Sequence, residues 1–190
     1  HTMKFLHTIM GKLPEFQELE TAVKAGALPA AVTGLSAIHK ANFIASLCVR
    51  QKRRAFVLAG DESEAQRLCA DLSAMGLRPL FHPYRDFSLR DTEGASHEYK
   101  RPRLQVLALM AAGEYDAVVA CPDAALQYTL PPEELKRRAL TLAPGQQISM
   151  EQAEAALAAC GYERAVQIDG SGQFSQRGGI LDVFPPDAPQ

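Results

Sequence analysis

Short apolar runs alternate with amphipathic helices along the first two thirds of the chain, and this alternation constrains the fold more than any other feature. Continuous apolar segments, typical of strands buried in a parallel sheet, occupy residues 55–59 and 116–120. Two further segments, 29–34 and 79–82, are predicted as shorter strands. Because helical periodicity lies between the strands, we predict an α/β fold with a parallel sheet and helices on both faces.

The predicted helices of this part span residues 14–25, 36–50, 61–75 and 97–112. The third helix begins at an acidic pair, Asp61-Glu62, which superficially resembles the metal-binding pair of a nucleotide hydrolase. Asp is a favoured helix N-cap, and a second carboxylate is stabilised by the positive end of the helix dipole. The pair is therefore interpreted as a helix start.

The pattern changes after Pro131-Pro132, and we predict two domains, 1–136 and 137–190. The second is α+β: a strand at 140–142, a helix opened by a capping box, two strands that form a hairpin, and a last strand. The predicted capping box joins Ser149 to Gln152, the hairpin strands are 163–169 and 173–177 about the turn 170–172, and the last strand is 180–184. These strands are too few for a closed core, so this domain is expected to be truncated.

The turn that follows the strand predicted at 29–34 is where α/β folds bind phosphate. A working loop has the pattern G-x-x-x-x-G-K-[ST], whose lysine reaches the phosphates and whose hydroxyl holds Mg²⁺. Placed on this chain, the two glycines become Ala31 and Ser36, the lysine becomes Ala37 and the hydroxyl becomes Ile38, so that only the internal Gly34 remains. We therefore predict a domain like the P-loop NTPases, of the RecA-like helicase type, with a degenerate phosphate loop that does not bind nucleotide.

Charge and cysteine usage narrow the class of protein further. The 20 basic and 22 acidic residues give a net charge of −2, which provides no general attraction to nucleic acid. The basic runs at 50–54 and 100–103 are interpreted as solvated helix ends. The four cysteines are not at metal-ligand spacing and are expected to be reduced core thiols, as in the cytoplasm. No apolar run approaches the length of a membrane span, so we expect no membrane partner. From the cysteine spacing and the altered phosphate loop, we also expect no metal site and no catalytic residue.

Several segments together resemble the N-terminal region of the bacterial transcription-repair coupling factors. The matching segments are 32–34, Phe81-His82-Pro83-Tyr84-Arg85-Asp86, the helix around Arg103-Leu104, and the terminal stretches 161–164 and 172–185. The last of these is also similar to a run in the excision-repair protein UvrB. The resemblance implies a non-catalytic UvrB homology module that binds UvrA and recruits nucleotide excision repair to a stalled RNA polymerase.

The resemblance also implies which activities lie elsewhere and which residues bind the partner. ATP and Mg²⁺ would serve translocase domains of the parent protein, which acts on duplex DNA. Carried over by position, the UvrA-binding residues are Arg164 and Arg177, with Phe174 open to either core packing or partner contact. The alternative is a UvrB-like ATP-dependent helicase or damage-loading domain, which requires the lysine and hydroxyl that Ala37 and Ile38 replace.

Overall fold

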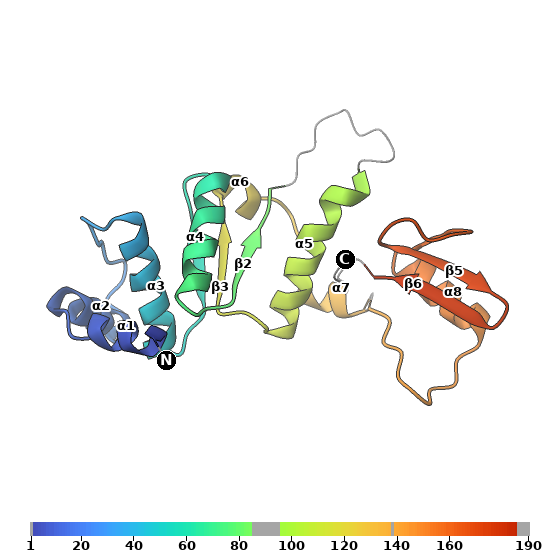
Figure 1. The fold of residues 1–190 in the computed structure, drawn as a ribbon, viewed down its shortest axis with the longest axis horizontal. Helices are drawn as coiled ribbons and strands as arrows, with labels where there is room; N and C mark the ends of the chain where they lie inside the picture. Colours follow the sequence, from blue (N-terminus) through green and yellow to red (C-terminus); the bar gives the residue numbers. More distant parts are fainter. Residues whose placement is uncertain (1, 85–95, 138, 186–190) are drawn as a thin grey trace. The chain divides into compact units, whose positions relative to one another are not determined.

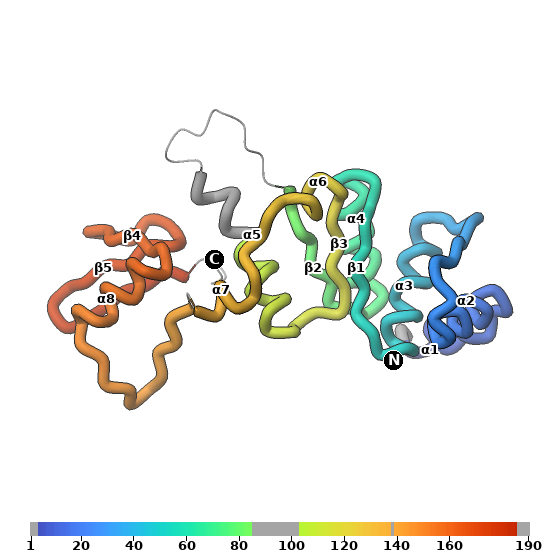
Figure 2. Tube along the Cα trace, turned by 180° about the vertical axis from the view of Figure 1, so that it is seen from behind, coloured from blue at the N-terminus to red at the C-terminus, as the bar shows by residue number. Residues whose placement is uncertain are grey.

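The computed structural model describes residues 2–84, 96–137 and 139–185, with backbone alone for residues 2–3 and 96–102. The chain forms two compact units: one contains the described residues up to 84 together with 112–127, and the other contains 96–111 together with 128–185. The course of the chain through both can be followed in Figure 1 and, from behind, in Figure 2. The domain boundary predicted between residues 136 and 137 stays a prediction.

The first unit is an α/β structure built on a small parallel sheet. Its described elements are α1 (Thr2–Met10), α2 (Pro14–Ala25), α3 (Ala37–Gln51), β1 (Ala55–Leu58), α4 (Glu62–Ala74), β2 (Pro79–His82), β3 (Ala117–Ala120) and α6 (Pro122–Ala125). The strand order is β1-β3-β2, and both pairings are parallel. Helix α4 packs on β2 and β3, α3 packs on α4, and α1 packs on α3. The predicted α/β class and parallel sheet are confirmed.

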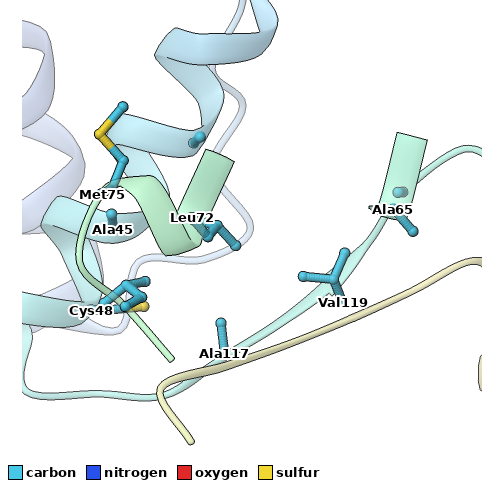
Figure 3. Close-up of a cluster of buried hydrophobic side chains, with 10 residues drawn as sticks. Ala45, Cys48, Ala65, Leu72, Met75, Ala117 and Val119 are labelled. Carbon is cyan, nitrogen blue, oxygen red and sulfur yellow. The ribbon is translucent and has the colours of Figure 1, made fainter. Parts of the chain in front are cut away.

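Small side chains dominate the core between this sheet and its helices. Figure 3 shows side chains from α3, α4 and β3 converging, among them Ala45, Leu72 and Val119. All three are completely buried, and strand β3 is buried along its whole length. Since alanine allows close approach of backbones, this core gains its stability from many short-range packing contacts.

The helix ends follow the sequence closely. Helix α2 ends where predicted, and Gly26 after it adopts the left-handed conformation, with φ of 68°, that glycine tolerates best. The Asp61 side chain accepts a hydrogen bond of 2.7 Å from the backbone N–H of Glu64, so the interpretation of Asp61 as a cap is confirmed. Helix α1 and the short helix α6 were not predicted.

The strand predicted at 29–34 is wrong: none of these residues forms a strand in the structure. Pro29 has no N–H to donate to a ladder, and in the described sheet β1 pairs only with β3. The prediction that 55–59 is a fully buried strand is wrong for one face, because Phe56 is 60% exposed and Leu58 is 58% exposed. An edge strand covered by helices on one face alternates in exposure, which apolar composition does not reveal.

The second unit combines helices with a mixed sheet. Its described elements are α5 (Ser96–Ala112), α7 (Pro132–Arg137), α8 (Met150–Ala159), β4 (Glu163–Arg164), β5 (Gln173–Arg177) and β6 (Ile180–Phe184). The strand order is β4-β5-β6, and α8 contacts β4. The predicted capping box of α8 is confirmed, since Ser149 and Gln152 exchange both of its hydrogen bonds.

The connections of this sheet differ from the prediction. Strands β4 and β5 are parallel, so the hairpin predicted about 170–172 is wrong. The antiparallel hairpin joins β5 to β6 through Gly178-Gly179, where Gly178 has a φ of 62°. The strand predicted at 140–142 is also absent. Glycines occur in both connections, and composition alone does not distinguish the tight two-residue turn of the β5–β6 hairpin from the connection between the parallel strands β4 and β5.

Candidate functional site

The segment predicted as a degenerate phosphate loop, residues 31–38, is largely exposed and contains no charged side chain. Ala31, Ala37 and Ile38 all lie on the surface, and Gly34 has a φ of 79°. Ser36 stands at the N-cap of α3 without a side-chain capping bond; its Oγ lies 3.1 Å from Nδ1 of His39. These side chains offer no cation and no metal-ligating carboxylate. Descent from a phosphate loop stays a prediction, since the strand that should precede it is absent.

A pocket of about 390 Å³ lies beside this segment, in the first unit. Most of its lining is apolar, and Lys40 is the one cation among the lining residues. The Nζ atom of Lys40 lies 3.8 Å from Oε1 of Glu64, whose other carboxylate oxygen accepts a hydrogen bond of 2.8 Å from the N–H of Gly60. A carboxylate in this position repels phosphate groups, so the pocket is poorly suited to a nucleotide.

Arg164 lies on strand β4 in the second unit. It pairs in register with Phe174, so its side chain leaves the sheet on the same face as that residue. On this face its Nη2 atom donates a hydrogen bond of 3.0 Å to Oε1 of Gln176 and lies 3.4 Å from Oε1 of Glu154, on α8. Its side chain remains 60% exposed, so the guanidinium is oriented by the fold and accessible from solvent.

Gln176 connects Arg164 to the hairpin turn. Its Oε1 atom accepts from Arg164, and its Nε2 atom donates a hydrogen bond of 3.0 Å to the carbonyl of Gly178. The two bonds use both ends of one amide, which fixes the amide orientation. The guanidinium of Arg164 is thereby held toward the end of the sheet at which the chain turns.

Arg177 is the last residue of β5, immediately before that turn. Its Nη2 atom donates a hydrogen bond of 2.6 Å to Oδ2 of Asp182 on β6, and its side chain is 73% exposed. Side chains alternate along a strand, so Arg177 projects from the face opposite to that of Phe174 and Arg164. The two predicted arginines therefore lie on opposite faces of the sheet. Arg164 is level with Phe174, the second residue of β5, and Arg177 is the last residue of that strand.

Phe174, the third predicted partner-binding residue, is only 3% exposed. It stands in the middle strand, on the face where Arg164 meets Glu154 of α8. Its burial favours core packing over direct contact with a partner, the two options that the sequence left open. Its partner-binding role is not tested by this burial.

Glu154, Gln176 and Asp182 were not predicted as part of this arrangement. One signal was present for Asp182: a two-residue turn at Gly178-Gly179 pairs Arg177 with Ile180 and places residue 182 diagonally across from Arg177. Glu154 is brought in from a separate helix, and no local pattern relates it to Arg164.

Other chemistry is sparse in the described part of the chain. No group of three or more His, Cys, Asp or Glu side chains there is arranged to hold a metal ion. All four cysteines are free, and burial raises the pKa of Cys69 to about 11, which keeps this thiol protonated and unreactive at neutral pH. Within the same residues, no helix has the length and apolar character needed to cross a membrane.

Known proteins resemble the chain over almost its whole length. Residues 140–190, which include both arginines, match the UvrB interaction domain family. The transcription-repair coupling factor of Bacillus subtilis is 28% identical over 186 residues, which is 96% of this chain. That of Staphylococcus aureus strain MRSA252 is 26% identical over 185 residues, again 96% of the chain. The resemblance to the transcription-repair coupling factors is therefore confirmed. The chain spans 16% of the length of these relatives.

Proposed function

We propose that this chain is a protein-binding module of a transcription-repair coupling factor and that it binds UvrA through Arg164 and Arg177. The observation that carries the proposal is that both arginines fall within the segment similar to the UvrB interaction domain, where their side chains are 60% and 73% exposed. In the parent protein this binding recruits nucleotide excision repair to a stalled RNA polymerase.

The chemistry of the site supports a protein partner that carries carboxylates. Guanidinium groups present a planar set of N–H donors that matches a carboxylate in two-point contact, and arginine is enriched among residues that dominate binding energy. Arg177 stands at the turn end of the small sheet, and on the other face the guanidinium of Arg164 reaches Gln176, the residue before Arg177. Neither residue is part of the core, so substitution is expected to spare the fold.

The first unit supports a non-catalytic role for this part of the protein. The positions that need lysine and a hydroxyl for phosphate transfer hold Ala37 and Ile38, and the nearby Lys40 is paired with Glu64. We propose that this unit is a P-loop-like, RecA-like domain whose phosphate loop has decayed. Hydrolysis of ATP with Mg²⁺ and translocation on duplex DNA are assigned to other parts of a cytoplasmic parent protein.

Binding of UvrA to the chain and to three alanine variants tests the proposal. Arg164→Ala and Arg177→Ala are each expected to weaken binding about tenfold, as loss of a hot-spot arginine commonly does. Arg137→Ala is the matched control, because Arg137 is also exposed, at 70%, and also bonded to a carboxylate, Glu134, at 2.6 Å. Equal affinity for all four proteins, measured by calorimetry, would show that UvrA does not use these arginines.

The competing function, a UvrB-like ATP-dependent helicase or damage-loading domain, makes the opposite prediction for nucleotide. Calorimetric titration of the chain with ATP and Mg²⁺ is expected to give no binding heat. Binding of ATP with micromolar affinity would favour the UvrB-like function over the one proposed.

A further inference from the structure

Among the residues that the structure describes, the hydrogen bond from Arg177 to Asp182 engages only part of the guanidinium. Arginine carries five N–H donors, and the hydrogen bond to Asp182 engages one nitrogen, Nη2, at 2.6 Å. The pair lies at the surface, with the side chains of Arg177 and Asp182 73% and 39% exposed. A carboxylate of this chain thus already sits where we propose that a partner's carboxylate binds.

We propose that Asp182 is an internal competitor that occupies Arg177 in the unbound chain and thereby sets the affinity for an acidic partner. This inference rests on the proposed function of Arg177. It adds a residue to which the resemblance assigned no role, and it identifies the partner's contact segment as one rich in Asp or Glu.

The competition follows from the weakness of an exposed ion pair. Solvent and salt screen such a pair, so that exchanging Asp182 for another carboxylate costs little. If the arriving carboxylate binds beside Asp182 instead of displacing it, the two negative charges repel each other. In both geometries the charge of Asp182 opposes binding.

A neutral substitute separates this charge from any structural part that Asp182 plays. Asparagine has the same shape and keeps an oxygen that accepts a hydrogen bond from Arg177. Asp182→Asn therefore preserves the orientation of the arginine while removing the competing charge. A purely structural role for Asp182 predicts equal or weaker binding in this variant.

Arg164 provides an internal contrast. Its neighbours are the neutral amide of Gln176 at 3.0 Å and the carboxylate of Glu154, whose side chain is only 21% exposed and lies 3.4 Å away. The neutral amide of Gln176 and the mostly buried carboxylate of Glu154 orient Arg164 from two sides. The proposed competition is confined to Arg177.

The test compares the affinities of wild type, Asp182→Asn, Arg177→Ala and the double variant for UvrA at low and high salt. Glu134→Gln is the matched control, since it also removes one negative charge bonded to an exposed arginine of the same unit. Asp182→Asn is expected to bind about two- to fivefold more tightly at low salt, a gain that shrinks at high salt, while Glu134→Gln binds like wild type.

The double variant decides whether the gain acts through Arg177. With Arg177→Ala in the background, Asp182→Asn is expected to give no gain. The inference is overturned if Asp182→Asn binds no more tightly than wild type, or if its gain persists without Arg177. Loss of affinity in Arg177→Ala together with no gain in Asp182→Asn would leave the proposed function standing and remove only the competitor. Unchanged affinity in Arg177→Ala would remove the competitor and the proposed role of Arg177, and the affinity of Arg164→Ala would then decide whether UvrA uses either arginine.

Discussion

The segment 31–38 and the turn end of the β5–β6 hairpin are both exposed, and each contains a glycine with positive φ, Gly34 and Gly178. They differ in the side chains that surround the turn. The first carries aliphatic groups, and the nearby Lys40 is paired with Glu64. The second carries Arg177, and the guanidinium of Arg164 reaches the neighbouring Gln176 from β4. Both arginine side chains have most of their surface open to solvent.

The difference teaches that an exposed loop at a favourable place in a fold does not by itself make a site. A binding site also needs side chains whose charge and geometry match a ligand, held in position by neighbours. In the first unit, ionic contacts such as that between Glu20 and Arg50 join helix to helix. In the second, they orient groups that face solvent. Changes to these ionic contacts are therefore expected to affect stability in the first unit and binding in the second.

The largest expected effect is loss of stability in Phe174→Ala. Removing a buried phenylalanine leaves a cavity and costs about 3–5 kcal/mol, which is a large share of the stability of a unit of this size. Hydrogen exchange of the β5 amides is expected to lose its protection, whereas Phe174→Leu should retain most of it. If Phe174→Ala kept this protection and still lost UvrA binding, Phe174 would be a contact residue, and the site would extend beyond the arginines.

A smaller loss of stability is expected in the first unit from Glu20→Gln. Glu20 is 6% exposed, and its carboxylate accepts two hydrogen bonds of 2.8 Å from Arg50 and one of 2.8 Å from Gln51. Charge-assisted bonds of this kind contribute about 2 kcal/mol, which denaturant unfolding would detect. Glu18→Gln, an exposed change on the same helix, is the control. If Glu20→Gln weakened UvrA binding as much as Arg177→Ala does, the ionic contacts of the first unit would contribute to binding as well as to stability.

The same ion pair gives a pH dependence with a defined sign. Hydrogen bonds from Arg50 hold the pKa of Glu20 below its ordinary value of 4.5. A carboxyl group with a lowered pKa binds protons more readily in the unfolded chain, so its stabilisation is complete above pH 4.5 and is lost as the pH falls through the lower, folded-state pKa. Over this range the unfolding free energy of wild type is expected to fall more steeply than that of Glu20→Gln.

The smallest expected effect belongs to the segment 31–38. Ile38 is 47% exposed, so Ile38→Thr is expected to change stability by less than about 0.5 kcal/mol. Because a single hydroxyl restores neither the lysine nor the glycines, we also expect no ATP binding and unchanged affinity for UvrA. Calorimetry with each ligand measures both. A measurable ATP affinity in this variant would show that the loop retains a phosphate-binding geometry. The segment 31–38 would then be a binding site as well.

The sequence by itself determined the elements whose signals are local. Gly26, the Asp61 cap and the Ser149–Gln152 capping box set helix ends through contacts within a few residues, and each prediction was confirmed. The class of the first unit was also predictable, because apolar strands that alternate with helices have few ways to bury their surfaces. The candidate arginines came from a motif similar to those of known proteins.

Tertiary structure alone decided how those elements pair. The segment 29–34 is apolar like a buried strand, but it does not join the described sheet. The apolar composition of β1 likewise did not show that one of its faces is exposed. Glycines at 170–172 marked a turn, but the parallel register of β4 and β5 depends on residues distant in sequence. That register places Arg164 and Arg177 on opposite faces of the sheet, and the β5–β6 hairpin sets Asp182 against Arg177. The physical reason is that pairing energy comes from contacts across the fold, which a pattern of neighbours along the chain does not contain.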